Sequence, residues 1–228
     1  MHLLEEALKS GVEIGALLVS EEVEREWASE APVYVLPRAL FRAIATTETP
    51  QGIITLVRPR AFEIEHVLAG HAILLDGIQD PGNAGAIVRA AEAFGGSGVV
   101  FLKSTVSPFN PKCLRASAGS LFRLPFVNHP DQDSVRRTIT ACGTALYAAM
   151  PNASLSIEDV DWSQPSAILI GSEGRGVSGD WSSIATSIRI PTTGVESLNA
   201  TVAAAVILYE ARKRQTNGPN PAPSPTRH

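Results

Sequence analysis

The chain has 228 residues, of which 44% are hydrophobic and 18% charged, and its formal net charge is −4. These proportions are typical of a globular protein and exclude wholesale disorder. No stretch approaches the roughly 18 uninterrupted apolar residues that a membrane-spanning helix requires. The opening segment MHLLEEALKSG is acidic and lacks the basic start and apolar run of a secretory signal.

The two cysteines, Cys113 and Cys142, are too few for a disulfide scaffold. No CxxC motif or Cys/His cluster predicts a metal site. The sequence therefore predicts a cytoplasmic protein with no metal and no membrane contact, and it leaves the reactivity of Cys113 open.

Charge is distributed unevenly along the chain. Residues 1–70 contain 6 basic residues (Lys and Arg together) and 11 acidic residues (Asp and Glu together). Residues 71–215 contain 12 basic and 12 acidic residues. The stretch 101–126 contains no acidic residue, and its cations are Lys103, Lys112, Arg115 and Arg123. On charge alone, this stretch is as well explained by a solvated face as by an anion site.

The first part of the chain alternates short strands and helices. Strands are predicted over 12–19, 31–37 and 51–59, and a helix over 21–30 with Ser20 as its N-cap. A further apolar pattern from Leu40 to Ile44 ends at a Thr/Pro stop. A small α/β unit is therefore expected, followed by a connector over 58–70.

A larger alternation begins at residue 71. Strands are predicted over 71–78, 98–102, 145–150, 166–171 and 187–191. Helices are predicted over 83–95, 110–120, 131–143 and 197–214. This order predicts a parallel sheet covered on both faces, and the proline-rich end of the chain is expected to be disordered.

Three segments with unusual polar residues lie where predicted strands end, which is where open α/β sheets bind ligands. The first, residues 74–95, contains Asn83, which could simply cap a helix, and Arg89. Arg89 emerges from a helix of small apolar residues, so its charge is expected to require an anion, a phosphate or an internal carboxylate as partner.

The second and third segments contain glycine-rich turns. Residues 168–178 form a loop around Glu173 that lacks the Lys-Ser/Thr ending of a phosphate-binding loop. In residues 188–214, Ser197 and Asn199 could cap the final helix. The small residues at the start of that helix permit a close contact such as an interface.

Together these segments resemble the SpoU (TrmH-type) family of RNA ribose 2′-O-methyltransferases. The matching motifs are DPGNAGAIVRAAEAFG, LIGSEGRGVS and IPTTGVESLNATVAAAVILYE, in the family's order and spacing, with KCLRASAGSLFRLPF between them. Residues 12–57, ending in TETPQGIITLV, resemble the second half of the small substrate-binding domain that many members carry in front. That domain departs from the pattern, since its opening strand and helix are expected to be missing and the remainder is acidic.

The resemblance implies a partial substrate-binding domain at 1–66, a methyltransferase domain at 67–215 and a disordered tail at 216–228. The fold would be the trefoil-knotted α/β fold of the SPOUT superfamily, which sequence rules alone would not predict. S-adenosylmethionine would bind in the knot of a homodimer, with the active site near the subunit interface. Ribosomal RNA is favoured over transfer RNA as the substrate.

The family's polar catalytic positions correspond to Arg89, Asn83, Glu173, Ser197 and Asn199. Asn83 and Glu173 are expected to hold Arg89 and the loops in place, whereas Ser197 and Asn199 would line the substrate side. A ribose hydroxyl is a very weak acid, so its proton must be removed or its oxyanion stabilised. Arginine is a poor base because its pKa exceeds about 12. A positioning and activating role for Arg89 is preferred, with base action as the alternative.

The remaining site positions follow from the same resemblance. Cofactor contacts correspond to Gly171, Ile190 and Leu198, with Ala148 and Ala149 as candidates for the pocket floor. RNA phosphates would meet the cations Lys103, Lys112, Arg115 and Arg123, with Arg89 at their centre.

Several alternatives remain in view. The chain could be a transfer-RNA ribose methyltransferase, or a knotted RNA-binding or assembly factor without catalysis. A transfer-RNA base methyltransferase is disfavoured by the motif DPGNAGAIVRAAEAFG. A dinucleotide oxidoreductase is disfavoured because no GxGxxG follows a first strand.

Overall fold

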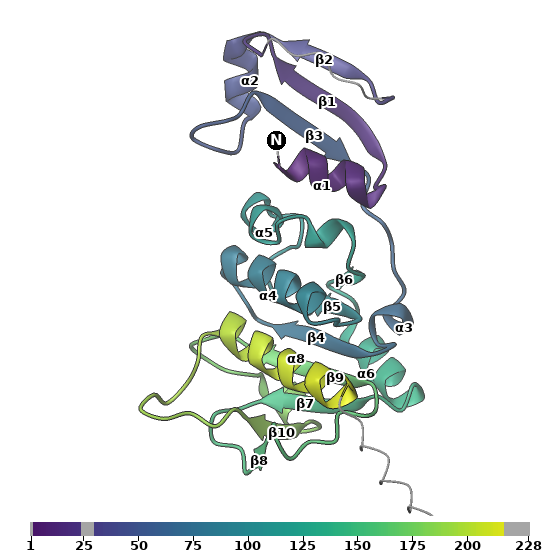
Figure 1. The fold of residues 1–228 in the computed structure, drawn as a ribbon, viewed down its shortest axis with the longest axis vertical. Coiled ribbons are helices and arrows are strands. Elements are labelled where there is room, and N and C mark those ends of the chain that lie inside the picture. The colour runs from purple at the N-terminus through teal and green to yellow at the C-terminus, as the bar shows by residue number, and fades with distance from the viewer. Residues whose placement is uncertain (1, 24–29, 217–228) are drawn as a thin grey trace, which may run out of the picture.

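The computed structural model describes residues 2–23 and 30–216, which form two units stacked along the long axis of the molecule (Figure 1). The front unit contains α1 (His2–Ser10), β1 (Ile14–Ser20), β2 (Val33–Leu36), α2 (Arg38–Ile44) and β3 (Ile53–Val57). Its sheet has the order β2-β1-β3, with β1 parallel to β2 and antiparallel to β3. The three strands predicted in this region are confirmed.

Helix α1 was not predicted. The expectation that the usual opening strand and helix of this domain are missing stays a prediction. Leu4 of α1 packs with Leu17 and Val19 of β1, so α1 covers one face of the small sheet. Of the helix predicted over 21–30, residues 21–23 form a turn and residues 24–29 lie outside the described residues.

The second unit alternates strands and helices. It contains α3 (Ile64–Val67), β4 (His71–Asp76), α4 (Pro81–Ala93), β5 (Gly98–Phe101), α5 (Pro111–Ala116), the 3₁₀ helix η1 (Ser120–Phe122), β6 (Phe126–Asn128), α6 (Gln132–Ala141), β7 (Ala145–Ala149), β8 (Leu155–Ser156), β9 (Ser166–Gly171), α7 (Gly179–Ser182), β10 (Thr186–Arg189) and α8 (Ala200–Thr216). Its strands form a seven-stranded sheet of order β6-β5-β4-β9-β7-β10-β8, in which every pair is parallel. The predicted parallel α/β sheet is confirmed.

Both faces of this sheet are buried, as the continuous apolar runs of its strands require. Ile73 and Leu75 of β4 belong to a core cluster with Ile87 of α4 and Ile207 of α8. The alternate residue Leu74 belongs to a second cluster with Val135 of α6 and other side chains of that face. Helices α4 and α8 therefore cover one face, and α6 covers the other.

Some element ends differ from the prediction. Helix α4 begins at Pro81 and not at residue 83, because Asp80 accepts the backbone N–H of Asn83 and caps the helix. Helix α8 extends to Thr216, which the sequence analysis assigned to the tail, and residues 217–228 lie outside the described residues. The knotted path of the chain stays a prediction. Among the described helices, none is long and apolar enough to cross a membrane.

Candidate functional site

The carboxyl ends of β4, β9 and β10 meet at one edge of the large sheet, on the left of Figure 1. β4 and β9 are direct neighbours, and Asp76 lies opposite Gly171. Each of these three strands is followed by one of the polar segments identified in the sequence. The topology therefore brings together polar residues that lie up to 116 positions apart in the chain, such as Asn83 and Asn199.

A polar cluster forms where these segments meet. The side-chain amide of Asn83, on α4, donates to Glu173 Oε1 over 3.1 Å, and the amide of Asn199 donates to the same oxygen over 2.5 Å. Asn199 Nδ2 also lies 3.4 Å from Asn83 Oδ1. Three of the five residues predicted to form the catalytic site therefore contact one another directly.

The cap residues of the two helices at the site differ in their roles. Asn199 Oδ1 accepts the backbone N–H of Thr201 over 2.9 Å, so Asn199 caps α8 while its amide group binds Glu173. The alternative role of Asn83 as a helix cap is wrong, because Asp80 holds that position. Asn83 is thus free to join the cluster, and its Oδ1 lies 3.3 Å from the Thr201 hydroxyl.

Thr201 and Asp76 were missed by the sequence analysis. The Thr201 hydroxyl reaches Asn83 from α8. The buried Asp76 carboxylate, at the end of β4, accepts the backbone N–H of Ser178 over 2.6 Å and ties down the glycine-rich loop. The sequence does contain a signal for Asp76, because this acidic residue ends an otherwise apolar strand and is followed directly by a glycine.

The loop that carries Glu173 is a tight turn of the backbone. Ser172 and Gly176 form a β-bridge, with 2.8 Å between Gly176 N and Ser172 O. A Cβ atom added to Gly171 would overlap the backbone of Gly176 and Val177. Glycine is therefore required at position 171, because only hydrogen leaves room for the returning chain.

Arg89 lies on α4 about 9 Å along the helix axis from Asn83, six residues at about 1.5 Å each. Its neighbours Ile87 and Val88 are buried, whereas Arg89 is exposed. Among the described residues it makes no hydrogen bond or ion pair, so that set contains no internal carboxylate partner, which was one of the three partners considered. Glu92, one turn further along the helix, is already bound by Arg123.

Of the expected cofactor residues, Ile190 and Leu198 are half-buried and precede Asn199 in the chain. Ala148 is completely buried in the core, so its side chain offers no surface to a ligand, whereas Ala149 is half-buried. A Cβ on Gly174 or Gly176 would meet no atom within 4 Å, so the backbone of this loop is open to a ligand. Half-buried apolar side chains and an open loop backbone are features that suit the adenosine part of S-adenosylmethionine.

The predicted RNA contacts divide into two groups. Lys103, Lys112 and Arg115 are exposed, and none of them makes an ion pair within the described residues. Cys113 and Ala116 turn the other face of α5 to Gly85 of α4 at close range. Arg123 is different, because Glu6 and Glu92 occupy its guanidinium. The RNA contact expected of Arg123 stays a prediction, and its guanidinium already forms two ion pairs within the protein.

Two further polar residues, Ser197 and Arg175, do not belong to the cluster of Asn83, Glu173 and Asn199. Ser197, an expected site residue, is exposed and makes no hydrogen bond to the described residues. Arg175, in the glycine-rich loop, is exposed and was not singled out in the sequence. No group of three or more His, Cys, Asp or Glu side chains within the described ranges is arranged to hold a metal ion.

Comparison with known proteins identifies the second unit. A family model described as the SpoU rRNA Methylase family matches residues 70–209. The chain belongs to this family. The front unit, residues 1–55, matches a model described as an MRM3-like substrate binding domain, and the SpoU unit therefore follows a domain of a substrate-binding type.

Relatives of this SpoU protein match along nearly its whole length. A 23S rRNA (guanosine(2553)-2′-O)-methyltransferase of Bacillus subtilis is 33% identical over 215 residues, which cover 92% of this chain and 86% of the relative. A 23S rRNA (uridine(2479)-2′-O)-methyltransferase of Streptomyces viridochromogenes is 30% identical over 230 residues, covering 93% and 80%.

A solved structure is similar to this SpoU protein in both fold and sequence. The SpoU methyltransferase AviRb from Streptomyces viridochromogenes, in complex with the cofactor AdoMet, superposes with a TM-score of 0.82 at 27% identity. The alignment covers 95% of this chain and 88% of that one, so it includes both units.

Proposed function

We propose that this protein transfers a methyl group from S-adenosylmethionine to a ribose 2′-hydroxyl of ribosomal RNA. The observation that carries the proposal is the contact of Asn83 with Glu173 and Asn199. Asn83 lies on α4, and the same helix presents Arg89, which is exposed and unpaired among the described residues. The resemblance of the motifs assigns these residues to the polar positions of a SpoU site, and the chain is a member of that family. Ribosomal RNA is favoured because both named relatives that align over the front unit act on 23S rRNA.

Arg89 is the group that meets the reacting ribose in this proposal. Its guanidinium is exposed, unpaired among the described residues and permanently charged. It cannot remove a proton at neutral pH, because it carries no free acceptor. Arg89 therefore binds the ribose and its phosphate and stabilises negative charge that develops on the 2′-oxygen.

The polar cluster orients the elements around Arg89. Glu173 Oε1 accepts both side-chain amides, so the glycine-rich loop is joined to α4 and to the start of α8. Because the two amides come from different helices, loss of the carboxylate would release both contacts at once. Glu173 and Asn83 are thus positioning residues, and Ser197 lies on the exposed side where RNA would approach.

The cofactor side is assigned to the loops after β9 and β10. Gly171 and the open backbone at Gly174 would hold the adenosine part, and Ile190 and Leu198 would contact its apolar surface. S-adenosylmethionine supplies an electrophilic methyl group when bound, so the protein's task is to align the hydroxyl and exclude water.

RNA would reach the site across the exposed cations of α5 and the loop after β5. Lys103, Lys112 and Arg115 contact phosphates in this proposal, which gives an affinity that falls as salt concentration rises. Phosphate contacts position the RNA and do not select the nucleotide. A homodimer in the cytoplasm, with its active site near the subunit interface, completes the proposal.

The test is methyl transfer from labelled S-adenosylmethionine to unmodified 23S, 16S and transfer RNA, each incubated separately and digested to nucleosides. We expect label in a 2′-O-methylnucleoside of ribosomal RNA, and none with Arg89→Ala. Label on a base would overturn the ribose assignment, and label in transfer RNA alone would overturn the choice of RNA. Retained RNA binding without cofactor binding or transfer would favour a non-catalytic RNA-binding factor.

A further inference from the structure

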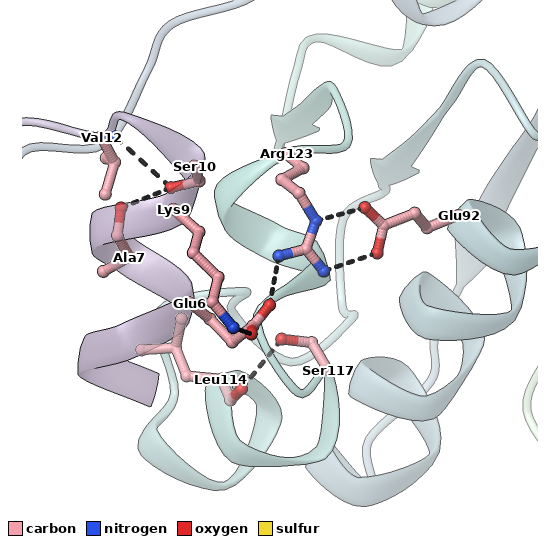
Figure 2. A network of polar contacts seen from close by, with 9 residues as sticks. All are labelled: Glu6, Ala7, Lys9, Ser10, Val12, Glu92, Leu114, Ser117 and Arg123. Carbon is pink, nitrogen blue, oxygen red and sulfur yellow. Dashed lines mark hydrogen bonds and ion pairs between the residues drawn. The ribbon is translucent and has the colours of Figure 1, made fainter. Parts of the chain in front are cut away.

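The front unit is attached to the methyltransferase unit through Arg123. Arg123 Nη1 lies 2.6 Å from Glu6 Oε2 on α1, while Nε and Nη2 lie 2.5 and 2.9 Å from the two carboxylate oxygens of Glu92 on α4 (Figure 2). The side chains of Glu6 and Glu92 are only 15% and 30% exposed. One guanidinium therefore joins the first helix of the front unit to the helix that carries Arg89.

The surroundings of Arg123 show that this contact is closely packed. A Cβ atom on Gly119 would lie 2.7 Å from Glu6 Cβ, so the absence of a side chain at Gly119 lets α1 approach. Gly119 also has a φ of +93°, which favours glycine. In the linker, Arg60 Nη2 donates to the carbonyls of Ser10 and Gly11 and holds the end of α1.

A cleft opens beside this junction. It has a volume of about 670 Å³ and lies between α1, the segment before β3 and helix α5. Leu4 and Ala7 of α1 line one side, Thr47 and Gln51 another, and Arg115 of α5 the third. Because Arg115 belongs to the proposed RNA surface, the orientation of the front unit sets the width of a cleft next to that surface.

We propose that Arg123 is a positioning residue, which fixes the front unit on α4 and thereby sets the affinity for the RNA substrate. This inference rests on the proposed function. Arg123 itself contacts no phosphate, since both carboxylates are bound to it. Loss of the Glu6 contact frees the front unit to rotate about the linker and weakens RNA binding, while Arg89 and the cofactor loops stay in place.

The two effects of removing Glu6 have opposite signs, which makes the test decisive. Glu6→Gln removes a negative charge from a protein that binds a polyanion, and this alone would lower the KM for RNA. Loss of the junction raises KM instead. Glu5→Gln is the matched control, because Glu5 lies on the same helix, is exposed and makes no ion pair within the described residues.

The kinetic experiment uses the full chain with unmodified 23S rRNA and labelled S-adenosylmethionine. We expect Glu6→Gln to raise the KM for RNA about fivefold, as the loss of a charge-assisted hydrogen bond permits, with kcat and cofactor affinity unchanged. Glu5→Gln should lower KM slightly or leave it unchanged. Arg123→Lys should give an intermediate KM, because an ammonium group keeps the charge but not the three-point contact.

A distance measurement tests the junction without reference to activity. Spin labels on the native exposed Cys142 and on Leu40→Cys, which lies at an exposed position of α2, report the separation of the two units. We expect one narrow distance distribution for the parent and for Glu5→Gln, and a broader one for Glu6→Gln. An unchanged distribution would overturn the junction, and a broader distribution with unchanged KM would overturn its role in RNA binding. If the parent enzyme methylates no RNA, the proposed function fails, and the distances alone decide whether Arg123 holds the two units.

Discussion

Asn199 donates its side-chain amide to the Glu173 carboxylate, with 2.5 Å between Nδ2 and Oε1. The two residues follow different strands, and Asn199 also caps α8 through its Oδ1 atom. One side chain therefore stabilises a helix and the glycine-rich loop that carries Glu173. A substitution that keeps the cap but removes the amide can separate these two contributions.

Asn199→Ser is that substitution, because serine is a good N-cap but its shorter side chain does not extend to Glu173. We expect methyl transfer to fall while the free energy of unfolding stays close to that of the parent. Asn199→Ala should lose activity and also about 1 kcal/mol of stability, since it removes the cap. Urea unfolding beside the transfer assay measures both. Equal activity of the serine variant and the parent would show that the Glu173 contact is dispensable.

Arg89→Ala should reduce kcat at least about a hundredfold, the order of effect seen when a donor to a developing oxyanion is removed. The fold should be unaffected, because Arg89 is exposed and makes no hydrogen bond or ion pair among the described residues. Calorimetric titration with S-adenosylmethionine is expected to give the parent affinity. Arg89→Lys keeps the charge without the planar fork and should recover only part of the activity. Full recovery by lysine would argue for a simple charge effect.

Gly171→Ala should weaken cofactor binding, because the new methyl group would overlap the backbone of Gly176 and displace the loop that carries Glu173. Gly179→Ala is the control, since a Cβ there meets no atom within 4 Å and Gly179 has no positive φ. Both variants can be titrated with S-adenosylmethionine. If Gly171→Ala binds S-adenosylmethionine with the same affinity as the parent protein, the cofactor binds away from this loop.

Because His71 is buried, we expect the stability of the protein to depend on pH. Burial lowers the pKa of His71 below its usual 6.5, and its Nδ1 lies 2.8 Å from the Ser166 hydroxyl. Because the unfolded chain binds a proton more readily than the folded one, the free energy of unfolding should decrease as pH falls below about 6.5. Urea unfolding at about pH 7.5 and about pH 5.5, on either side of that value, measures this free energy. We expect the difference between the two pH values to be smaller in His71→Gln than in the parent. An equal difference in both proteins would assign the effect to other groups.

The two cysteines should differ in reactivity. Cys113 is buried, and burial raises the pKa of its thiol to about 12, whereas Cys142 is exposed. Since the thiolate is the reactive form, a thiol reagent at pH 8 should modify one cysteine per native chain and both after unfolding. Cys142→Ser should abolish the native reaction. Rapid modification of Cys113 in that variant would reveal local opening between α4 and α5.

The sequence determined the parallel sheet and the three polar segments, because continuous apolar strands and glycine-rich turns are local patterns. It also indicated membership of the SpoU family, since each motif is a continuous stretch of residues. Helix α1 was missed, because a short amphipathic segment can be recognised only when its partners are known. The cap of α4 was misplaced for a similar reason, as both Asp80 and Asn83 are suitable residues and only the backbone path selects between them.

The tertiary structure alone decided which polar residues are paired. Arg89 and Arg123 are both arginines in segments that resemble the family, yet Arg89 is unpaired among the described residues and Arg123 is bound by Glu6 and Glu92. Glu6 lies 117 positions from Arg123 in the chain. Sequence patterns report local periodicity, whereas the partner of a charged side chain depends on which distant elements pack together.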